Sequence, residues 1–463
     1  MVAGGTKRGK DCLIDRYGYR YHVDRRRGER TYWRCCTRST SGCGAAVVQV
    51  GNEFRRGVHE HIDPPSPGMF EATTARMNIK QSALADVFKS AHDIVDDELN
   101  SALAGEQAAV PCGAFARPDT LARAANRARQ RMRPADPQSL DFELDTDFVP
   151  PNFFRSDVKV KNQRHLIFAT DAALSVLPHV KTVYMDGTFK VVRKPFVQLF
   201  SLHAFVQCDT NVKQVPLVFI LMSRRQTKDY RAVFRELRAL TNITWKTIVS
   251  DFELALWNAT REIFPGTVHR GCFFHWSQAL LRHLRCDAGL QKEYQSDDMV
   301  RKICKLLFAL PFLPPSDIRV AFDRIVNKVS GLYSDKLFAL CRYVKETWID
   351  SKVWPPERWS VYQRPIRTNN DCEGWHFRLN AKARKNSLPL YVMIRLLHRE
   401  GTTVTWQMRM LSEGKVLRRR KARQQCMEAA LYKLWTQFAA GKRSAYKLLR
   451  ACSHLYAPTV PTD

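Results

Sequence analysis

The sequence lacks the features that mark secreted and membrane proteins. No apolar run approaches the roughly 20 residues that a membrane-spanning helix needs, and the N-terminus has no signal-peptide pattern. The 13 cysteines are odd in number and scattered, which does not fit a disulfide framework. We therefore expect a soluble, intracellular chain with reduced thiols and no membrane partner.

Acidic residues are scarce relative to basic ones. The chain has 74 Lys and Arg but 45 Asp and Glu, which gives a formal net charge of +29. Such an excess predicts a polyanionic partner, nucleic acid first. Since 45% of the 463 residues are hydrophobic, the charge belongs to folded domains, and the length predicts two to four of them at roughly 150 residues each.

Two proline-bearing breaks divide the N-terminal part of the chain. Residues 64–68 (PPSPG) and 150–151 (PP) interrupt any regular structure, because proline removes a backbone donor and fixes φ. They predict a first small domain at 12–63 and a second region at 70–150.

The first domain alternates short β-like pieces with turns and contains a candidate zinc site. Its predicted ligands are Cys35, Cys43, His59 and His61. Coordination of Zn²⁺ by two thiols and two imidazoles would order a segment that is too small to hold a core. Cys36 adjoins Cys35 and is an alternative first ligand.

These residues resemble the FLYWCH-type zinc finger. In that family an aromatic-rich strand leads to W-x-C, a second Cys follows, and an H-x-H pair closes the site. Here the W-x-C motif ends at Cys35. The aromatic lead consists of Tyr17, Tyr19, Tyr21 and Tyr32. Arg25, Arg26 and Arg27 make the module basic, and they are candidate DNA contacts as well as a possible solvated face.

The region 70–150 is predicted to be basic and helical. Helical periodicity runs from 75 to 103, and a second helix is expected at 118–133. Its arginines are Arg123, Arg127, Arg129, Arg131 and Arg133, of which Arg127 and Arg131 are our DNA-binding candidates. The two helices fit a helix-turn-helix-like reader and equally fit packing onto the next domain.

Two aspartates follow predicted strands in the region 165–286. Strands are expected at 182–185, 196–206, 214–222 and before Asp251, with helices at 228–240 and 253–264 and a further strand and helix after them. Asp186 ends the first strand and Asp251 the fourth. Taken alone, Asp251 is as well explained as a helix N-cap.

The order β-β-β-α-β-α-β-α is that of the ribonuclease H-like fold, in which the first and fourth strands lie side by side. Asp186 and Asp251 would then face one another. Adjacent carboxylates repel unless a cation lies between them, so the pair implies a divalent ion such as Mg²⁺.

At this point the residues resemble the Mutator-like element (MULE) transposases. The motifs are DGTF at Asp186, SDFELAL at Asp251, and GCFFHWSQ with Cys272 and His275. The Cys272-x-x-His275 pair is a family motif that fits three roles: holding a zinc ion, positioning the acidic site, or packing internally.

The third acid of such a site lies late in the chain. Residues 287–365 are predicted to be an all-helical insertion, followed by a catalytic-core helix within 366–400. There the segment TNNDCEGWH resembles the family's T-N-N-x-x-E-x-W-H, so Glu373 would complete an Asp-Asp-Glu triad. Asp371 points about 200° away on the same helix, whereas His376 shares the face of Glu373 and suits phosphate contact or proton transfer.

Basic residues follow the third acid. Arg378, Lys382, Arg384 and Lys385 are candidate DNA contacts on or after the catalytic helix. The basic helical tail, 401–463, carries a further cluster at 415–423, which fits a nuclear import signal and equally a phosphate-binding face.

The resemblance implies a nuclear DNA transposase with a ribonuclease H-like catalytic domain. Asp186, Asp251 and Glu373 would hold two Mg²⁺ or Mn²⁺ ions for cutting and joining transposon ends. Double-stranded DNA, as terminal inverted repeats and as target, would be the partner of a homo-oligomer. The alternatives are a domesticated transposase that acts as a zinc-finger DNA-binding transcription regulator, and a structure-selective nuclease of the same fold.

Overall fold

The computed structural model describes residues 1–2, 5, 9–102, 113–130, 132–208, 211–331, 334–364, 370–383, 387–413 and 422–456. The predicted DNA contacts Arg131, Arg384 and Lys385, and the basic cluster at 415–421, lie outside these residues. The chain divides into two compact units, Met1–Ala135 and Asp136–Asp463. Within the described residues, no helix combines the length and apolar character needed to cross a membrane.

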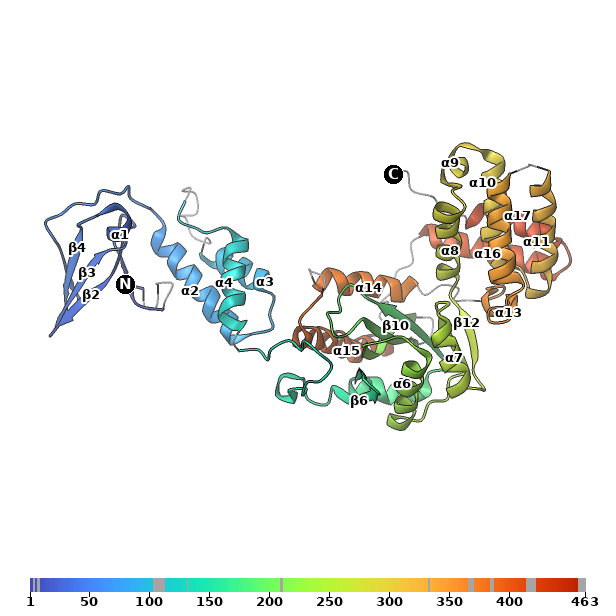
Figure 1. Ribbon diagram of the computed structural model, residues 1–463, viewed down its shortest axis with the longest axis horizontal. Helices are drawn as coiled ribbons and strands as arrows, with labels where there is room; N and C mark the ends of the chain where they lie inside the picture. The colour runs from blue at the N-terminus through green and yellow to red at the C-terminus, as the bar shows by residue number, and fades with distance from the viewer. Residues whose placement is uncertain are drawn as a thin grey trace. The chain divides into compact units, whose positions relative to one another are not determined.

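The N-terminal unit begins with an antiparallel sheet, as the alternating pattern predicts. The sheet order is β1-β2-β3-β4-β5, and the short helix α1 connects β3 to β4 (Figure 1). The elements are β1 (Cys12–Ile14), β2 (Arg20–Arg27), β3 (Arg30–Cys35), α1 (Arg38–Ser41), β4 (Ala46–Val50) and β5 (Glu53–Arg56). Tyr21 and Trp33 are the large side chains of its core. A core this small is typical of modules that a bound metal stabilises.

Helices follow in the same unit, and the predicted helix at 75–103 is in fact two. The elements are α2 (Met69–Ala85), α3 (Ala91–Ala102) and α4 (Pro118–Gln130). The break occurs because the Asp86 carboxylate accepts the backbone N–H groups of Phe88 and Lys89, at 3.0 Å each, which forms a turn. Ile79, Val95 and Leu121 then pack the helices against one another.

Not every arginine of α4 is free to contact DNA. Arg129 is 3% exposed, and its guanidinium donates to the backbone carbonyls of Asp86 and Lys89. It therefore ties α4 to the turn between α2 and α3. Arg127 is exposed.

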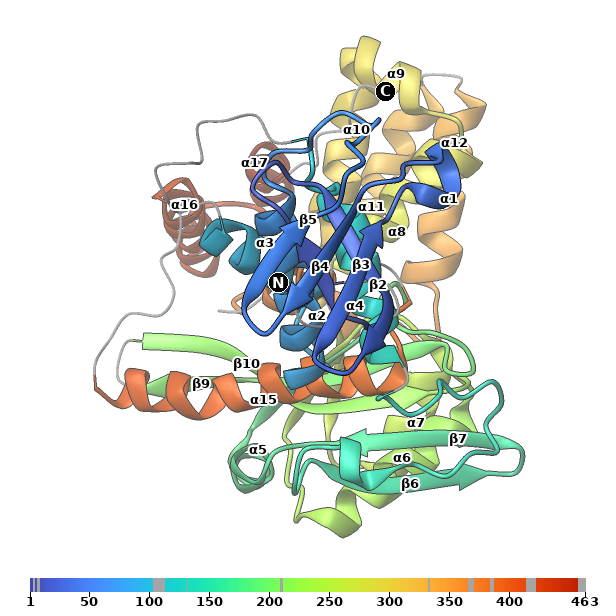
Figure 2. The same ribbon diagram turned by 90° about the vertical axis from the view of Figure 1, so that its left-hand side faces the viewer.

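The C-terminal unit contains a mixed sheet with the order β12-β11-β8-β9-β10-β7-β6. The strands are β6 (Phe154–Val160), β7 (Gln163–Phe168), β8 (Thr182–Thr188), β9 (Gln198–Cys208), β10 (Asn211–Met222), β11 (Thr247–Ser250) and β12 (Val268–Gly271). β11 runs parallel to both β8 and β12, and the other pairings are antiparallel. The sequence pattern did not predict β6, whose alternating residues Arg155, Asp157 and Lys159 are charged. The hairpin of β6 and β7 extends the sheet beside β10 (Figure 2).

Helices cover both faces of this sheet. They are α5 (Asp171–Val176), α6 (Thr227–Leu240), α7 (Leu254–Ile263), α14 (Asn370–Ala383) and α15 (Leu390–Ser412). On one face Tyr230 and Phe234 of α6 pack against Phe200 of β9. On the other face Trp375 of α14 stacks on Phe219 of β10, with ring centroids 5.8 Å apart. The mixed α/β class is therefore confirmed.

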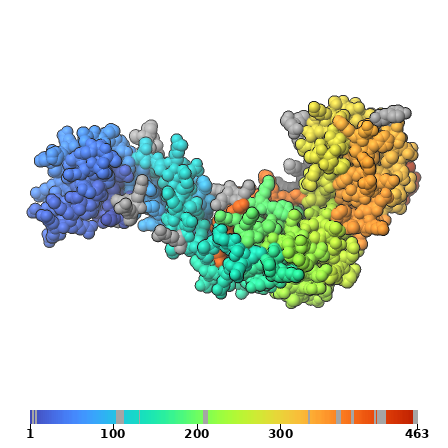
Figure 3. All heavy atoms as spheres, in the orientation of Figure 1, coloured from blue at the N-terminus to red at the C-terminus, as the bar shows by residue number. Residues whose placement is uncertain are grey.

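Helices that precede α14 in the sequence and helices that follow it pack together into one helical body. Its helices are α8 (Phe273–Arg282), α9 (Gln291–Ser296), α10 (Asp298–Ala309), α11 (Pro315–Ser330), α12 (Asp335–Val344), α13 (Pro356–Trp359), α16 (Ala422–Ala439) and α17 (Ala445–Leu455). One core contains Trp276, Trp348, Trp359 and Trp435, and the Trp435 indole N–H donates to the Phe312 carbonyl at 3.0 Å. Figure 3 shows the yellow and orange helices of this body as one closely packed mass. The C-terminal tail thus contributes to the core of the insertion.

Candidate functional site

The first two acids meet because of the strand register. β11 pairs in parallel with β8, and Val249 lies opposite Tyr184. The same register continued by two residues places Asp251 beside Asp186. Asp186 is 5% exposed within β8, and Asp251 follows the last residue of β11. The sheet therefore aligns the two carboxylates at the carboxyl ends of neighbouring parallel strands.

Glu373 reaches the same place from α14. The ligand atoms of Asp186, His275 and Glu373 all lie within 4.8 Å of one another. His275 Nε2 is 3.2 Å from Glu373 Oε1. Asp251 is not part of this tight group, but its negative charge acts on Glu373 and that of Asp186 acts on Asp251. We call Asp186, Asp251, His275 and Glu373 the acidic cluster.

His376 holds the first acid of the acidic cluster. Its Nδ1 is 3.3 Å from the Asp186 carboxylate and its Nε2 is 3.4 Å from Ser201 Oγ, which is itself 2.9 Å from His203 Nε2. Burial alone would raise the pKa of Asp186, but the hydrogen bond and charge of His376, with the charge of His275, lower it below its ordinary value. Asp186 is thus kept ionised although it is buried.

Trp375 explains why α14 lies where Glu373 can face the cluster. Its ring packs on Phe219, and its indole N–H donates to the Glu400 carboxylate of α15 at 2.8 Å. Lys382 pairs with the same carboxylate. The last two residues of the TNNDCEGWH motif therefore have different roles: Trp375 anchors α14 to the sheet and to α15, and His376 contacts Asp186.

A buried network fixes the backbone at Asp251. The indole N–H of Trp257 donates to the Asp251 carbonyl at 2.7 Å, and the Trp257 ring stacks on His269 at 3.8 Å. His269 lies 2.8 Å from Ser250 Oγ and 2.7 Å from Thr260 Oγ1. Burial lowers the pKa of His269 to about 3, so this histidine is neutral. Sequence reasoning missed Trp257 and His269, since neither belongs to a motif of polar ligands.

The electrostatics of the acidic cluster fit a divalent cation. Burial, followed by the charge of Asp186, raises the pKa values of Asp251 and Glu373. Among the described residues, no group donates a hydrogen bond of good geometry to the buried Glu373 Oε1. A hard cation would relieve the repulsion and fill the coordination of this oxygen, because Mg²⁺ prefers carboxylate ligands.

His275 supplies positive charge to the cluster. Burial opposes its protonation, but hydrogen bonding to Cys272 and the charges of Cys272, Asp186 and Asp251 raise its pKa to about 10. Cys272 is fully buried at the N-cap of α8. The pair therefore connects the start of α8 to the acids.

A separate Cys/His group lies in the N-terminal unit. The ligand atoms of Cys35, Cys43 and His61 are within 4.8 Å of one another, and Cys43 Sγ is 3.5 Å from His61 Nδ1. His59 is exposed and is not part of this group, with its ring against the backbone of Gly44. The structure thus brings together three of the four predicted ligands.

The surroundings of His61 suit a metal ligand. Tyr19 stacks on its ring at 3.6 Å. Tyr21 Oη donates to Asp15 at 3.2 Å and lies 2.6 Å from His61 Nε2. Because this hydroxyl already donates to a carboxylate, it accepts the Nε2 proton, which leaves the lone pair of Nδ1 pointing toward the thiols. Such an outer partner is typical of histidines that bind zinc.

The predicted DNA contacts that the structure describes are on the surface. Arg25, Arg26 and Arg27 are exposed along β2, and Arg25 lies over the Tyr32 ring at 4.8 Å. Arg378 and Lys382 are exposed on α14.

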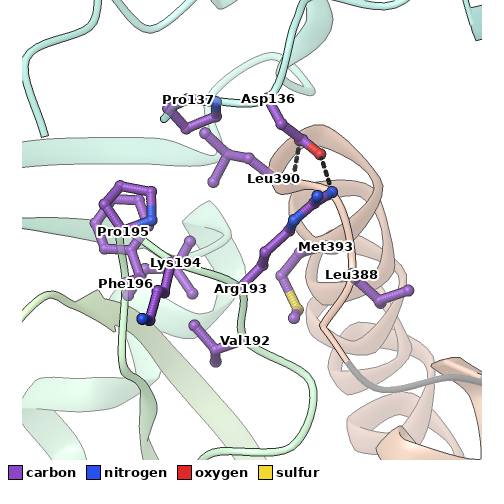
Figure 4. A pocket seen from close by; sticks show the side chains of 11 residues that line it. Asp136, Pro137, Val192, Arg193, Lys194, Pro195, Phe196, Leu388, Leu390 and Met393 are labelled. Atoms are coloured by element: carbon purple, nitrogen blue, oxygen red, sulfur yellow. Dashed lines mark hydrogen bonds and ion pairs between the residues drawn. The ribbon is translucent and has the colours of Figure 1, made fainter. Parts of the chain in front are cut away.

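A pocket of the C-terminal unit is distinct from the acidic cluster. Its wall is mainly apolar, and Asp136 lies at its edge, bonded to Arg193 at 2.7 Å and to the Leu390 amide at 2.9 Å (Figure 4). None of the cluster residues lines it. The charged residues among those that line it are Asp136, Arg193 and Lys194.

Comparisons with known families agree with both sites. Residues 182–279 match the MULE transposase domain, a range that includes Asp186, Asp251, Cys272 and His275. The chain carries a MULE transposase domain. Residues 5–62 match the FLYWCH zinc finger domain and include all predicted zinc ligands. No curated protein matches the chain.

The MULE domain and the FLYWCH finger together confirm the architecture that the sequence motifs predict. The MULE domain suggests a transposase-like function, and the FLYWCH finger suggests Zn²⁺ and DNA binding. Glu373 lies outside the matched range of the MULE domain, so its assignment depends on the TNNDCEGWH motif and on its place beside Asp186.

Proposed function

We propose that the chain is a DNA transposase that cuts and joins transposon ends through a ribonuclease H-like catalytic domain. The observation that carries this proposal is that Asp186 and Glu373 have ligand atoms within 4.8 Å of one another, while Asp251 follows β11, the parallel neighbour of β8. The strand order β12-β11-β8-β9-β10, with the first and fourth predicted strands adjacent, supports the same fold.

In this proposal the three carboxylates hold two Mg²⁺ or Mn²⁺ ions. Such ions would activate the attacking oxygen and stabilise the leaving oxygen of a phosphodiester. His376 keeps Asp186 ionised and oriented through its 3.3 Å contact. His275, held by Cys272, contacts Glu373 and positions it, which is the second of the three roles considered for the Cys272/His275 motif.

The basic surfaces would bind double-stranded DNA, as terminal inverted repeats and as target. The finger, with Cys35, Cys43, His61 and the nearby His59 as zinc ligands, would present the arginines of β2 to phosphates. Arg378 and Lys382 would hold the duplex near Glu373. We further propose that the chain works in the nucleus as a homo-oligomer, which brings two ends together.

Donor excision tests this function. A plasmid that carries the inverted repeats flanking the coding region is offered to the wild type, to Asp251→Asn and to Asp323→Asn, an exposed acid of α11 that serves as control. We expect the wild type and Asp323→Asn to excise and Asp251→Asn to bind DNA without excising. Equal excision by Asp251→Asn would refute the catalytic assignment. If the wild type and both variants all bind DNA and none of them excises, the result would favour a transcription regulator.

A further inference from the structure

A partly exposed aromatic–cation pair lies next to the acidic cluster. Phe189 is 50% exposed and follows Asp186 by three residues, which is about 10 Å along an extended chain. The guanidinium carbon of Arg225 lies over the Phe189 ring, 4.8 Å from its centroid. Arg225 follows β10, and its side chain is 45% exposed. The segments that follow two strands of the same sheet therefore supply one surface of stacked ring and cation.

A chain of contacts that ends in buried groups holds Arg225 in place. Arg225 is 3.7 Å from the Glu253 carboxylate, which accepts the Tyr230 hydroxyl at 3.2 Å. Gln198 in turn donates to Tyr230 Oη at 2.9 Å. Tyr230 and Gln198 are buried to 1% exposure or less. A side chain that buried groups hold in place and that is partly exposed to solvent is suited to contact a ligand, because little side-chain freedom is lost on binding.

The Phe189–Arg225 pair is partly exposed to solvent and lies close to the acidic cluster. The positive charge of Arg225 acts on both Asp251 and Glu253. Lys190, the next residue after Phe189, is exposed. A DNA strand offers alternating phosphates and aromatic bases at a spacing of a few ångströms, so one ring and one guanidinium match one nucleotide.

We propose that Phe189 and Arg225 form a nucleotide platform, on which the base beside the scissile phosphate stacks on Phe189 while Arg225 contacts the adjoining phosphate. This rests on the proposed function. The platform would hold a strand end that has left the duplex, because the ring faces of a base inside a duplex are covered by its stacked neighbours. It positions the strand and takes no part in bond breaking.

Photocrosslinking tests the platform without requiring strand cleavage. The full chain is mixed, without added Mg²⁺ or Mn²⁺, with a duplex whose single-stranded thymidine extension carries one iododeoxyuridine. After irradiation, the crosslinked peptide is mapped by mass spectrometry. We expect the peptide that contains Phe189. Phe189→Ala and Phe189→Leu should lower the yield roughly tenfold, the loss typical of one unstacked base, and Phe189→Tyr should restore it.

A matched pair elsewhere in the unit provides the control. Arg324 lies over the Tyr446 ring at 4.2 Å in the helical body, so Tyr446→Ala removes a similar contact and should leave the crosslink unchanged. Arg225→Ala should reduce the salt dependence of single-strand binding by about one phosphate contact. Crosslinks that map to other residues, that persist in both Phe189 variants, or that do not form at all would overturn the platform.

The outcome is separable from that of the proposed function. If Asp251→Asn cuts DNA as well as the wild type while the crosslink still maps to Phe189, the catalytic assignment fails and the platform stands. If Asp251→Asn is inactive and Phe189→Ala crosslinks and cuts normally, the function stands and the platform fails.

Discussion

The Cys/His group of the finger and the acidic cluster of the C-terminal unit both gather ligands from distant positions, but different forces hold them. In the finger, Cys43 and His61 lie in a module whose core is little more than Tyr21 and Trp33. The acidic cluster lies at the edge of a large sheet between packed helices, where Phe200 and Phe219 are buried on opposite faces. The finger would therefore need its metal in order to fold, whereas the acidic cluster would bind its metal at a site that the folded sheet and helices already hold in place.

Zinc removal should show the largest difference between the two sites. We expect Cys43→Ser to unfold the finger, because binding of structural zinc is worth about 10–16 kcal/mol in small fingers and little else holds this module. Hydrogen exchange should lose protection in β3 but not in β8. Cys286→Ser, at an exposed cysteine, is the control. If β3 stays protected in Cys43→Ser, the finger does not depend on metal.

The next effect is that of Asp186→Asn on strand cleavage. We expect a loss of about a thousandfold, since several kcal/mol of charge stabilisation go with a metal ligand. Circular dichroism should show an unchanged fold, in contrast to Cys43→Ser. A variant that cleaves within tenfold of the wild type would remove Asp186 from the site.

The pH dependence of stability should expose the repulsion in the metal-free acidic cluster. The folded pKa of Asp251 is raised, so the folded state binds this proton more tightly than the unfolded state does. In the presence of a chelator, Asp251 should therefore lower the free energy of unfolding progressively as the pH rises above 3.8, the ordinary pKa of an aspartate side chain. Urea unfolding followed in β8 should show a weaker pH dependence for Asp251→Asn. An unchanged pH profile would contradict burial of this carboxylate.

A smaller effect is expected for Trp257→Phe. This change removes the hydrogen bond to the Asp251 carbonyl but keeps a ring against His269. The rate of cleavage should fall about fivefold, because one hydrogen bond contributes about 1 kcal/mol. Trp435→Phe removes a similar indole bond in the helical body and should leave the rate unchanged. Equal effects of the two substitutions would mean general destabilisation.

The smallest effect should come from the surface of the finger. Arg27→Ala should reduce the slope of log affinity against log salt concentration by about 0.9, the contribution of one duplex phosphate, with little change in sequence preference. The control is Arg324→Ala. An unchanged slope would identify the arginines of β2 as a solvated face.

Local sequence signals predicted the parts of the fold that repeat a simple pattern. Short apolar runs predicted the strands at 182–185 and before Asp251, and β8 and β11 are observed there as an adjacent parallel pair. β8 continues past the predicted end to Thr188, so Asp186 lies within the strand. The charged strand β6 has no such pattern. The turn at Asp86 depends on one carboxylate that accepts two amides, so the helix at 75–103 was predicted as one instead of two.

The candidate site was predictable where residues carry ligand atoms. Cys35, Cys43 and His61 meet as the motif indicates, but His59 does not join them. The supporting residues were not predictable: Trp257 reaches Asp251 through its backbone carbonyl, and Arg225 meets Phe189 only because two strand ends adjoin. Such contacts depend on tertiary packing rather than on spacing along the chain.

The central claim is that Asp186, Asp251 and Glu373 form one divalent-metal site. Mn²⁺ titration of the full chain, followed by electron paramagnetic resonance, tests it most directly, with Asp371→Asn on the same helix as Glu373 as control. We predict that Asp186→Asn, Asp251→Asn and Glu373→Gln each weaken or abolish Mn²⁺ binding, whereas Asp371→Asn does not. Undiminished Mn²⁺ binding by Asp251→Asn would contradict the claim.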